Sequence, residues 1–387
     1  MKRIYMDNAA TTPVKKEVLN AMIPFFTEQY GNASSIYVST GQEARLALDE
    51  SRQKIASIFN ISEREVYFTS GGSEADNWAV KGIAYANKSK GNHIITSKVE
   101  HHAILHTCEY LETQGFEVTY LDVDEFGMVD PKSVESAIKE NTILISIMYA
   151  NNEVGTIQPI KEISNIAKKH KVYFHTDAVQ AIGNMKIDFK ELGVDAASIS
   201  AHKIYGPKGV GMLYLKKGTK IDNFIHGGAQ EYRKRATTEN IPGIVGFAKA
   251  LELAHTNLDT HINKLNEMKE LLIEKIEKTI PEVKLNGHRT KRLPGNVNFS
   301  IKYIEGESIL LSLDMMGIIA SSGSACTSGS LDPSHVLLAM GMPHETAHGS
   351  LRLSLGDFNE KQDIDYVVTE LAKIVERLRM MSPLYKG

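Results

Sequence analysis

The stretch Ser198-Ile199-Ser200-Ala201-His202-Lys203 closes an apolar run and leads into the turn residues Gly206-Pro207. A strand that ends in this way places a lysine at the carboxyl edge of a sheet, where open α/β sheets bind ligands. Taken alone, Lys203 would more simply be a solvated loop residue, because most lysines lie at the surface. A second polar strand end, upstream in the chain, favours a ligand site.

That second strand end reads His175-Thr176-Asp177-Ala178-Val179-Gln180 and follows the apolar residues 172–174. A lysine and an aspartate at two such strand ends are the residues that a pyridoxal phosphate site requires. The lysine amine forms a Schiff base with the cofactor, and the carboxylate keeps the pyridine nitrogen protonated so that the ring accepts electrons. The two stretches therefore predict a pyridoxal phosphate site on Lys203 and Asp177.

Composition and charge indicate a globular protein and give no sign of a nucleic-acid-binding, membrane or secreted protein. The chain has 387 residues, 42% of them hydrophobic and 24% charged, which is typical of a globular protein with one large and one smaller domain. Its formal net charge of −3 gives no reason to expect nucleic acid or an anionic membrane as a partner. Because no stretch approaches the roughly 18 apolar residues of a membrane span and none reads as a secretion signal, we expect a cytoplasmic protein.

Strand-like and helix-like runs alternate through the first two thirds of the chain. The strand-like runs lie at 66–69, 94–96, 118–121, 143–148, 172–175, 196–200 and 211–215. The helix-like stretches between them include 74–86, 103–113, 131–139 and 160–169. This alternation is typical of a mostly parallel sheet with helices on both faces, so we expect an α/β fold.

The pattern changes near residue 255. Apolar residues recur at helical spacing from Leu258 to Ile276, which predicts a long amphipathic helix ending at Pro281. Shorter mixed elements follow, with a strand at 296–301 and a last helix at about 364–379. We therefore expect a large domain at 15–255 and a smaller α+β domain made of 1–14 and 256–387.

A candidate phosphate site, Ser70-Gly71-Gly72-Ser73, lies between a strand and a helix expected to begin near Glu74. Backbone N–H groups at the start of a helix, together with a serine hydroxyl, form a cradle for an anion. Alone, such a stretch is more often a turn with a serine cap. Combined with Asp177 and Lys203, it becomes the natural seat for the phosphate of the cofactor.

Two further polar residues follow predicted strands. His101, in Glu100-His101-His102, could stack on the pyridine ring and move protons, or it could cap a helix. Asn152 could bond the phenolic oxygen of the cofactor, or it could serve only the turn. Adjacent histidines on an extended chain point to opposite sides, so the pair at 101–102 is a poor metal site.

The two cysteines lie in different surroundings. Cys108 lies in an apolar helical stretch and is expected in the core. Cys326 lies in the small-residue run 321–330, which suits an accessible nucleophile or sulfur carrier. Two cysteines are too few for a disulfide framework or for a metal site built on cysteine.

Arg352 alternates with apolar neighbours in Ser350-Leu351-Arg352-Leu353-Ser354, which predicts a half-buried strand. A buried arginine needs a partner. That partner is either a substrate carboxylate held by two parallel hydrogen bonds or a carboxylate of the chain itself, and the sequence leaves both possibilities open.

Together, these stretches resemble one family. From Tyr5-Met6-Asp7-Asn8-Ala9-Ala10-Thr11-Thr12-Pro13 to Arg352, the chain is similar to cysteine desulfurases of the NifS/IscS type, in the class V aminotransferase group of fold-type I pyridoxal phosphate enzymes. The most specific stretches are 200–209 and 321–326, and the second resembles the group with the longer cysteine loop. The resemblance implies a large domain with a mostly parallel seven-stranded sheet, a smaller α+β C-terminal domain and a homodimer.

The resemblance also implies a role for each matching residue. Lys203 would form the Schiff base, Asp177 would pair with the pyridine nitrogen, and His101 would stack on the ring. The phenolic oxygen would be bonded by Asn152 and Gln180. The phosphate would be held by Gly72, Ser73, Ser200 and His202, and in the other subunit's site by Thr238. Arg352 would bind the carboxylate of L-cysteine, and Cys326 would receive sulfur as a persulfide.

Three positions depart from the family pattern. Ala201 and Thr237 stand where glycine is common, so we expect the backbone at Thr237 to avoid positive φ. Members of the family often carry a histidine after an Asn-Pro-x-Ser stretch, and the matching Asn32-Ala33-Ser34-Ser35-Ile36-Tyr37-Val38 has none.

The sequence thus predicts a cysteine desulfurase that passes sulfur from Cys326 to an iron–sulfur scaffold or another acceptor protein. An aminotransferase or a selenocysteine lyase of the same group is the closest alternative, but a transaminase has no need of a nucleophilic loop thiol. A scaffold protein without catalysis, or a thiol–redox protein, is the alternative from another class.

Overall fold

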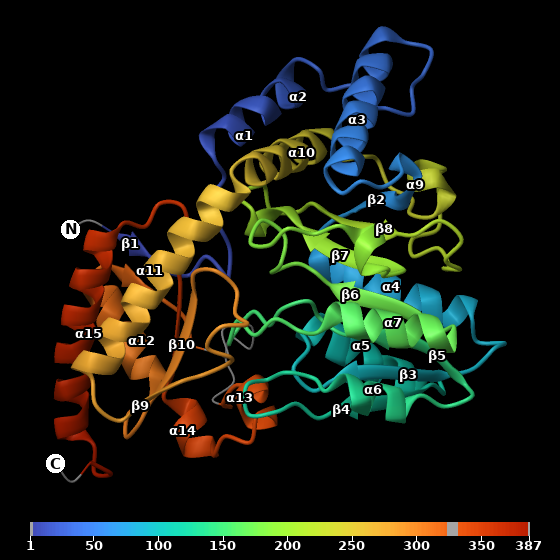
Figure 1. Cartoon of the computed structure of the whole chain (residues 1–387). Coiled ribbons are helices and arrows are strands. Elements are labelled where there is room, and N and C mark those ends of the chain that lie inside the picture. Colours follow the sequence, from blue (N-terminus) through green and yellow to red (C-terminus); the bar gives the residue numbers. More distant parts are fainter. Residues whose placement is uncertain (1–2, 323–331, 386–387) are drawn as a thin grey trace.

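The computed structural model describes residues 3–322 and 332–385, in which helices surround three sheets of unequal size. Figure 1 shows the large sheet in one half of the molecule. The smaller sheets lie in the other half, beside the long helices α11 (Leu258–Thr279) and α15 (Lys361–Met381).

Among the described residues, the large sheet has seven strands in the order β2-β8-β7-β6-β5-β3-β4. Strand β8 runs antiparallel to both of its neighbours, and the other pairings are parallel. The strands are β2 (Val66–Thr69), β3 (His93–Ser97), β4 (Glu117–Leu121), β5 (Thr142–Ser146), β6 (Tyr173–Asp177), β7 (Ala196–Ser200) and β8 (Gly211–Leu215). The predicted mostly parallel α/β sheet is confirmed, because each strand coincides closely with an expected run.

Helices cover both faces of this sheet. Successive strand residues point to opposite sides, and apolar residues on each side are buried under these helices. Ile94 packs in the core beneath α4 (Gly72–Ala86) and α5 (His102–Thr113), whereas its neighbour Ile95 packs in the core on the opposite face. The other helices of this half are α1 (Lys16–Met22), α2 (Pro24–Thr27), α3 (Ser39–Ile58), α6 (Pro131–Ala137), α7 (Ile160–His170), α8 (Phe189–Leu192), α9 (Gln230–Arg233) and α10 (Ile241–Thr256), with 3-10 turns η1 (Glu63–Glu65) and η2 (Ala201–Lys203). Within the described part of the chain, no helix is both long enough and apolar enough to cross a membrane.

The smaller sheets share a second core. Strand β10 (Asn296–Ile301) pairs antiparallel with β9 (Val283–Leu285) and β12 (Ser350–Ser354), and β1 (Ile4–Tyr5) pairs parallel with β11 (Ile318–Ile319). The remaining helices are α12 (Gly306–Met315), α13 (His335–Ala339) and α14 (His344–His348). Ile4 and Met6 are buried in this second core with residues of α11, α12 and α15. A core separate from that of the large sheet favours a division into 15–255 and 1–14 plus 256–387, which stays a prediction.

Strand β12 is more deeply buried than the sequence predicted. All of its residues are buried, so the expectation of a half-buried strand is wrong. Leu351 and Leu353 pack in the second core, as expected. The polar face is also covered, because Ser354 accepts a hydrogen bond from the backbone of Ala9 (2.9 Å) and Arg352 donates to the carbonyl of Asn152 (3.1 Å). The polar face of β12 therefore lies at the junction of the two halves.

A buried ion pair anchors the strand that leads into α4. Arg52 on α3 makes two hydrogen bonds to Glu231, of 2.9 and 2.7 Å, and both side chains are almost fully buried. Glu231 also accepts the N–H of Phe68 on β2 (2.8 Å), and the Arg52 guanidinium lies over the ring of Phe68. Residues 231–233 all have positive φ, a costly conformation that persists only where the surrounding contacts impose it.

We expect Glu231→Gln to destabilise the protein, because removal of one partner leaves Arg52 as an uncompensated buried charge. Breaking such a pair costs about 3–5 kcal/mol, so the melting temperature followed by circular dichroism should fall by several degrees. Asp122→Asn is the matched control, since Asp122 pairs with Lys98 while 85% exposed and exposed pairs contribute at most about 1 kcal/mol. Equal melting temperatures for the two variants would contradict the proposed anchor.

Candidate active site

One cavity of about 350 Å³ opens where β5, β6 and β7 end. Among the described residues, every predicted site residue except Thr238 lines it: Gly72, Ser73, His101, Asn152, Asp177, Gln180, Ser200, His202, Lys203 and Arg352. They come from separate parts of the chain and converge because parallel strands present their carboxyl ends at one edge of the sheet. Ala9, Ala10, Asp76, Met148 and Val179 complete the lining, and sequence reasoning had given none of them a role.

Lys203 ends the turn η2 directly after β7. Its Nζ donates to the carbonyl oxygens of Ala9 (2.6 Å) and Ala10 (2.7 Å), so the N-terminal segment holds the ammonium group at the cavity. Gln180 also donates to the carbonyl of Ala9 (2.9 Å). The ends of β6 and β7 are thus connected through one short stretch of backbone.

Asp177 ends β6, and its carboxylate accepts the N–H of Val179 at 2.9 Å. Burial raises the pKa of Asp177 to about 6, and Lys203 opposes this rise. An aspartate in such a position is only partly satisfied, so a cation placed in the cavity would favour its ionised form. A protonated pyridine nitrogen is a cation of this kind.

A second acid, Asp76 on α4, lines the same cavity and interacts electrostatically with Asp177. Its Oδ1 makes no hydrogen bond within the described residues, and burial, followed by the charge of Asp177, raises its pKa well above the usual value. His175 lies beside it, with Nε2 at 3.8 Å from Asp76 Oδ1 and 2.9 Å from Ser198 Oγ. Because burial lowers the pKa of His175 to about 3, this histidine stays neutral. The sequence signal for Asp76 was its position on the first turns of the helix after Ser73.

Helix α4 begins at Gly72, slightly earlier than predicted, and its N-cap Gly71 supplies no side chain to the first backbone N–H groups. A Cβ on Gly72 would lie 2.7 Å from Val179 Cγ2, so the chain approaches closely only because residue 72 is glycine. The side chain of Ser200 lies against this glycine. Uncapped amides at a helix start, beside Ser73 and Ser200, form a site for an anion.

His101 is the N-cap of α5, since its Nδ1 accepts the N–H of Ala103 at 3.1 Å. The capping alternative is therefore correct, and the same ring also lines the cavity. Burial, with help from Lys203, lowers the pKa of His101 to about 4, so the imidazole is neutral. His102 is the first residue of α5, and so the argument that placed both histidines on an extended chain is wrong for His102.

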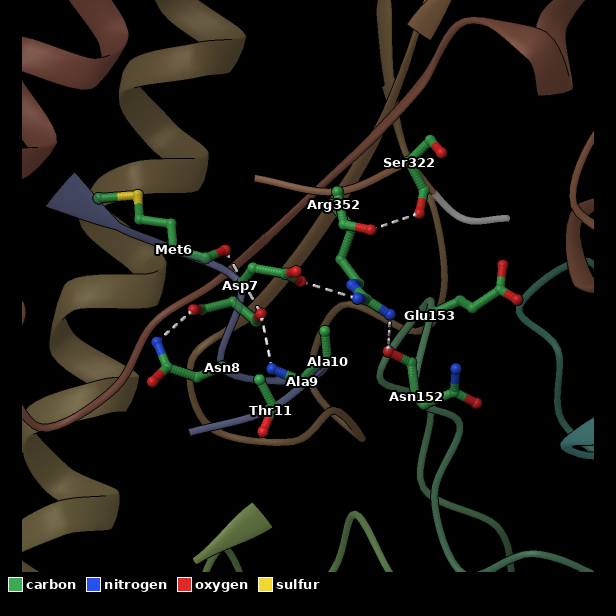
Figure 2. Close-up of polar contacts among 12 residues, drawn as sticks. Met6, Asp7, Asn8, Ala9, Ala10, Thr11, Asn152, Glu153, Ser322 and Arg352 are labelled. Atoms are coloured by element: carbon green, nitrogen blue, oxygen red, sulfur yellow. Dashed lines mark hydrogen bonds and ion pairs between the residues drawn. The ribbon is translucent and has the colours of Figure 1, made fainter. Parts of the chain in front are cut away.

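Arg352 is held by the chain itself. Its Nη2 donates to Asp7 Oδ1 at 2.9 Å and its Nη1 to the carbonyl of Asn152 at 3.1 Å, whereas the buried Nε makes no hydrogen bond within the described residues. Figure 2 shows the guanidinium between the N-terminal segment and the Asn152 turn. Of the two partners that the sequence allowed for Arg352, the structure shows a carboxylate of the chain itself. This carboxylate is Asp7, which the sequence analysis did not identify.

Glu153 follows Asn152 and is buried close to Arg352. The hydroxyl of Ser334, the N-cap of α13, donates to its carboxyl group. Burial raises the pKa of Glu153 to about 7, and the hydrogen bond with Ser334 and the charge of Arg352 oppose this rise. The adjacent Asn152 was the residue that the sequence singled out, and Glu153 carried no separate signal.

Four further predictions concern Thr238, Cys326, Thr237 and Cys108. Thr238 is exposed in the single chain, in the segment between α9 and α10, and Cys326 lies outside the described residues. Thr237 is not among the described residues with positive φ, as expected. Cys108 is buried in the core and its pKa is raised by burial, so its predicted place is confirmed.

Comparison with known proteins agrees with this geometry. The family model described as aminotransferase class-V matches residues 4–367. The chain belongs to the class V aminotransferase family. It is 59% identical over 387 residues to a cysteine desulfurase IscS of Clostridium botulinum, covering 100% of this chain and 97% of the relative. It is 58% identical to the IscS of Methanosarcina thermophila over 383 residues, 99% of this chain and 94% of that one.

Solved structures support the same group. A NifS-like protein superposes with a TM-score of 0.92 at 38% identity and covers 97% of this chain and 100% of that one. A structure described as SspA in complex with cysteine has a TM-score of 0.79 at 34% identity, with 93% and 100% covered. The chain is thus an enzyme of the cysteine desulfurase type, with the predicted pyridoxal phosphate fold.

The cavity fits the cofactor of this family. A pyridoxal phosphate molecule requires a lysine amine, an acid for its ring nitrogen and an anion site. Lys203, Asp177 and the uncapped start of α4 provide these on one cavity. The raised pKa of Asp177 and the close approach at Gly72 are the observations on which this fit depends.

We expect Glu153→Gln to flatten the pH dependence of stability. Folding raises the pKa of this carboxyl from 4.5 to about 7, so the folded protein retains a proton that the unfolded chain releases, and stability falls as the pH rises through this window. The amide keeps an acceptor for Ser334 but does not titrate. The fall in melting temperature from about pH 5 to about pH 7.5 should therefore be smaller in the variant than in the wild type.

Glu125→Gln is the matched control for this experiment, because Glu125 is an exposed glutamate in the loop after β4. Its melting curve should follow the wild type at every pH. Superimposable pH profiles for wild type and Glu153→Gln would show that this carboxyl does not titrate on folding.

Proposed function

We propose that the chain converts L-cysteine to L-alanine and carries the released sulfur as a persulfide on Cys326. The observation that carries this proposal is the single cavity shared by Lys203, Asp177 and Arg352. The cysteine desulfurases among its relatives support the same reaction. The neighbour solved in complex with cysteine supports L-cysteine as the substrate.

The residues of the cavity would hold pyridoxal phosphate. Lys203 would bond it covalently, Asp177 would pair with its ring nitrogen, and His101 would stack on the ring. Its phosphate would be taken by Gly72, Ser73, Ser200 and His202, and its phenolic oxygen by Asn152 and Gln180. When bound, this cofactor supplies an electron sink for the bonds around the α-carbon of the substrate.

Lys203 and His101 would handle the protons. The carbonyls of Ala9 and Ala10 orient Nζ of Lys203, which as a neutral amine takes the proton from the substrate α-carbon. Because Nδ1 of His101 accepts the N–H of Ala103, its neutral ring carries the proton on Nε2. His101 can therefore donate one proton from Nε2 toward the cavity.

Cys326 would take the sulfur. Its thiolate attacks the sulfur of the substrate, a bond forms between the two sulfur atoms, and the bond between Cβ and sulfur breaks. The electron pair of that bond stays on Cβ, which takes up a proton, so L-alanine leaves and Cys326 holds one additional sulfur. Arg352 would hold the substrate carboxylate during this step.

The proposed reaction requires a second copy of the chain and an acceptor for the sulfur. A homodimer would bring Thr238, exposed in the single chain, to the phosphate site of the other subunit. An iron–sulfur scaffold or another acceptor protein would remove the sulfur from Cys326. The cytoplasm, where thiols stay reduced, remains the predicted location.

The reaction is tested by incubating cofactor-loaded protein with L-cysteine and a reductant while sulfide and alanine are measured. We expect both products in equal amounts from the wild type and a loss of both, by about a hundredfold or more, in Cys326→Ala, because the sulfur then lacks its acceptor. Cys108→Ala is the matched control, since Cys108 is buried in the core and takes no part.

The absorbance of the bound cofactor should persist in Cys326→Ala, which separates a lost acceptor from a lost cofactor. Undiminished formation of alanine in that variant would instead indicate a lyase that releases sulfur directly from the substrate.

A further inference from the structure

The carboxylate of Asp7 forms an ion pair with Arg352, the residue that the proposed function assigns to the substrate carboxylate. Asp7 Oδ1 lies 2.9 Å from Arg352 Nη2, and the side chains are 16% and 2% exposed, respectively. An isolated guanidinium at such a depth would be costly, because a buried charge needs a partner. Asp7 is the carboxylate that forms an ion pair with Arg352 among the described residues.

The backbone holds Asp7 in place on both sides. Asp7 pairs with Ser354 on the end of β12, where the N–H of Ser354 donates to Met6 (2.7 Å) and the N–H of Asn8 donates to Ser354 (3.2 Å). The carbonyl of Asp7 accepts the N–H of Ala10 at 3.0 Å and the hydroxyl of Tyr5 at 3.0 Å. These contacts fix the backbone of Asp7, from which its carboxylate reaches Arg352.

The guanidinium of Arg352 does not use all of its N–H donors within the described residues. Arginine has five N–H donors in a planar fork. One on Nη2 goes to Asp7 and one on Nη1 to the Asn152 carbonyl, whereas Nε has no hydrogen-bond partner within the described residues although it is buried. A buried donor without a partner is costly, and a ligand that accepts a hydrogen bond from Nε would remove this cost. Two fixed contacts on the outer nitrogens thus set the plane in which Nε–H is offered.

We propose that Asp7 is a positioning residue that orients Arg352 for the carboxylate of the substrate. Asp7 cancels the charge of the guanidinium and fixes its plane (Figure 2), so a carboxylate is recognised by the direction of the remaining N–H groups rather than by charge alone. This inference rests on the proposed function, because that function brings a substrate carboxylate to Arg352.

A positioning role and a purely structural role for Asp7 have different consequences for ligand binding. A structural role would weaken every ligand of the cavity equally. A positioning role weakens ligands that carry a carboxylate and spares amines that lack one. The relevant quantity is the ratio of the dissociation constants of ethylamine and L-alanine, which differ by one carboxylate.

Both dissociation constants are measured on cofactor-loaded protein from the change in cofactor absorbance, together with the melting temperature. We expect Asp7→Ala to lower the ratio at least tenfold and to leave the dissociation constant of ethylamine unchanged. Asp7→Asn keeps an oxygen that accepts from Nη2 and should restore most of the ratio. Asp7→Asn also provides a readout if Asp7→Ala does not fold.

Asp357→Asn is the matched control. Asp357 follows β12 and pairs with Lys15 and, at 2.5 Å, with His261, and it does not contact Arg352 in the described structure. Its loss should lower the melting temperature but not the ratio. An unchanged or increased ratio in Asp7→Ala, or an equal weakening of both ligands, would overturn the proposal. Sulfide release by the wild type is measured separately, so a failed desulfurase reaction leaves the result on Asp7 readable.

Discussion

The parallel pairing of β5, β6 and β7 is the constraint on which the site depends. Because these strands run in one direction, the turns that follow them open at one edge of the sheet and bring Asn152, Asp177 and Lys203 to a single cavity. The smaller half adds Arg352 on β12, and the segment at residues 7–12 joins the two halves. Through Asp7 and the Ala9 and Ala10 carbonyls, that segment contacts both cationic residues of the site.

Burial gives the polar groups of this cavity their chemical character. Carboxyls that lack enough donors release their protons only at higher pH, as the raised pKa values of Glu153 and Asp177 indicate. Histidines in the same region stay neutral, because burial and the nearby Lys203 lower the pKa of His101 and His202 to about 4. The cavity is therefore prepared for a ligand that brings its own charges, a ring cation and two anionic groups.

Much of the fold and of the site could be predicted from local patterns. Each of three contiguous stretches indicates its chemistry from its residue types alone. They are the strand end at Asp177, the stretch that ends at Lys203 and the glycine-rich start of α4. Asp7, Asp76 and Glu153 could not be found in this way, because their importance comes from partners far along the chain. The burial of both faces of β12 was missed for a similar reason. Alternation shows which residues face the core but not that the N-terminal segment and the Asn152 turn cover the other face.

Everything proposed for this cavity depends on Lys203 as the residue that bonds the cofactor. The most direct measurement is borohydride reduction of the pyridoxal phosphate-loaded protein, followed by mass analysis of its peptides. We expect a phosphopyridoxyl group on Nζ of Lys203 in the wild type and none on that peptide in Lys203→Ala. A group attached to another lysine such as Lys208, or a protein that reduction leaves unmodified, would contradict it.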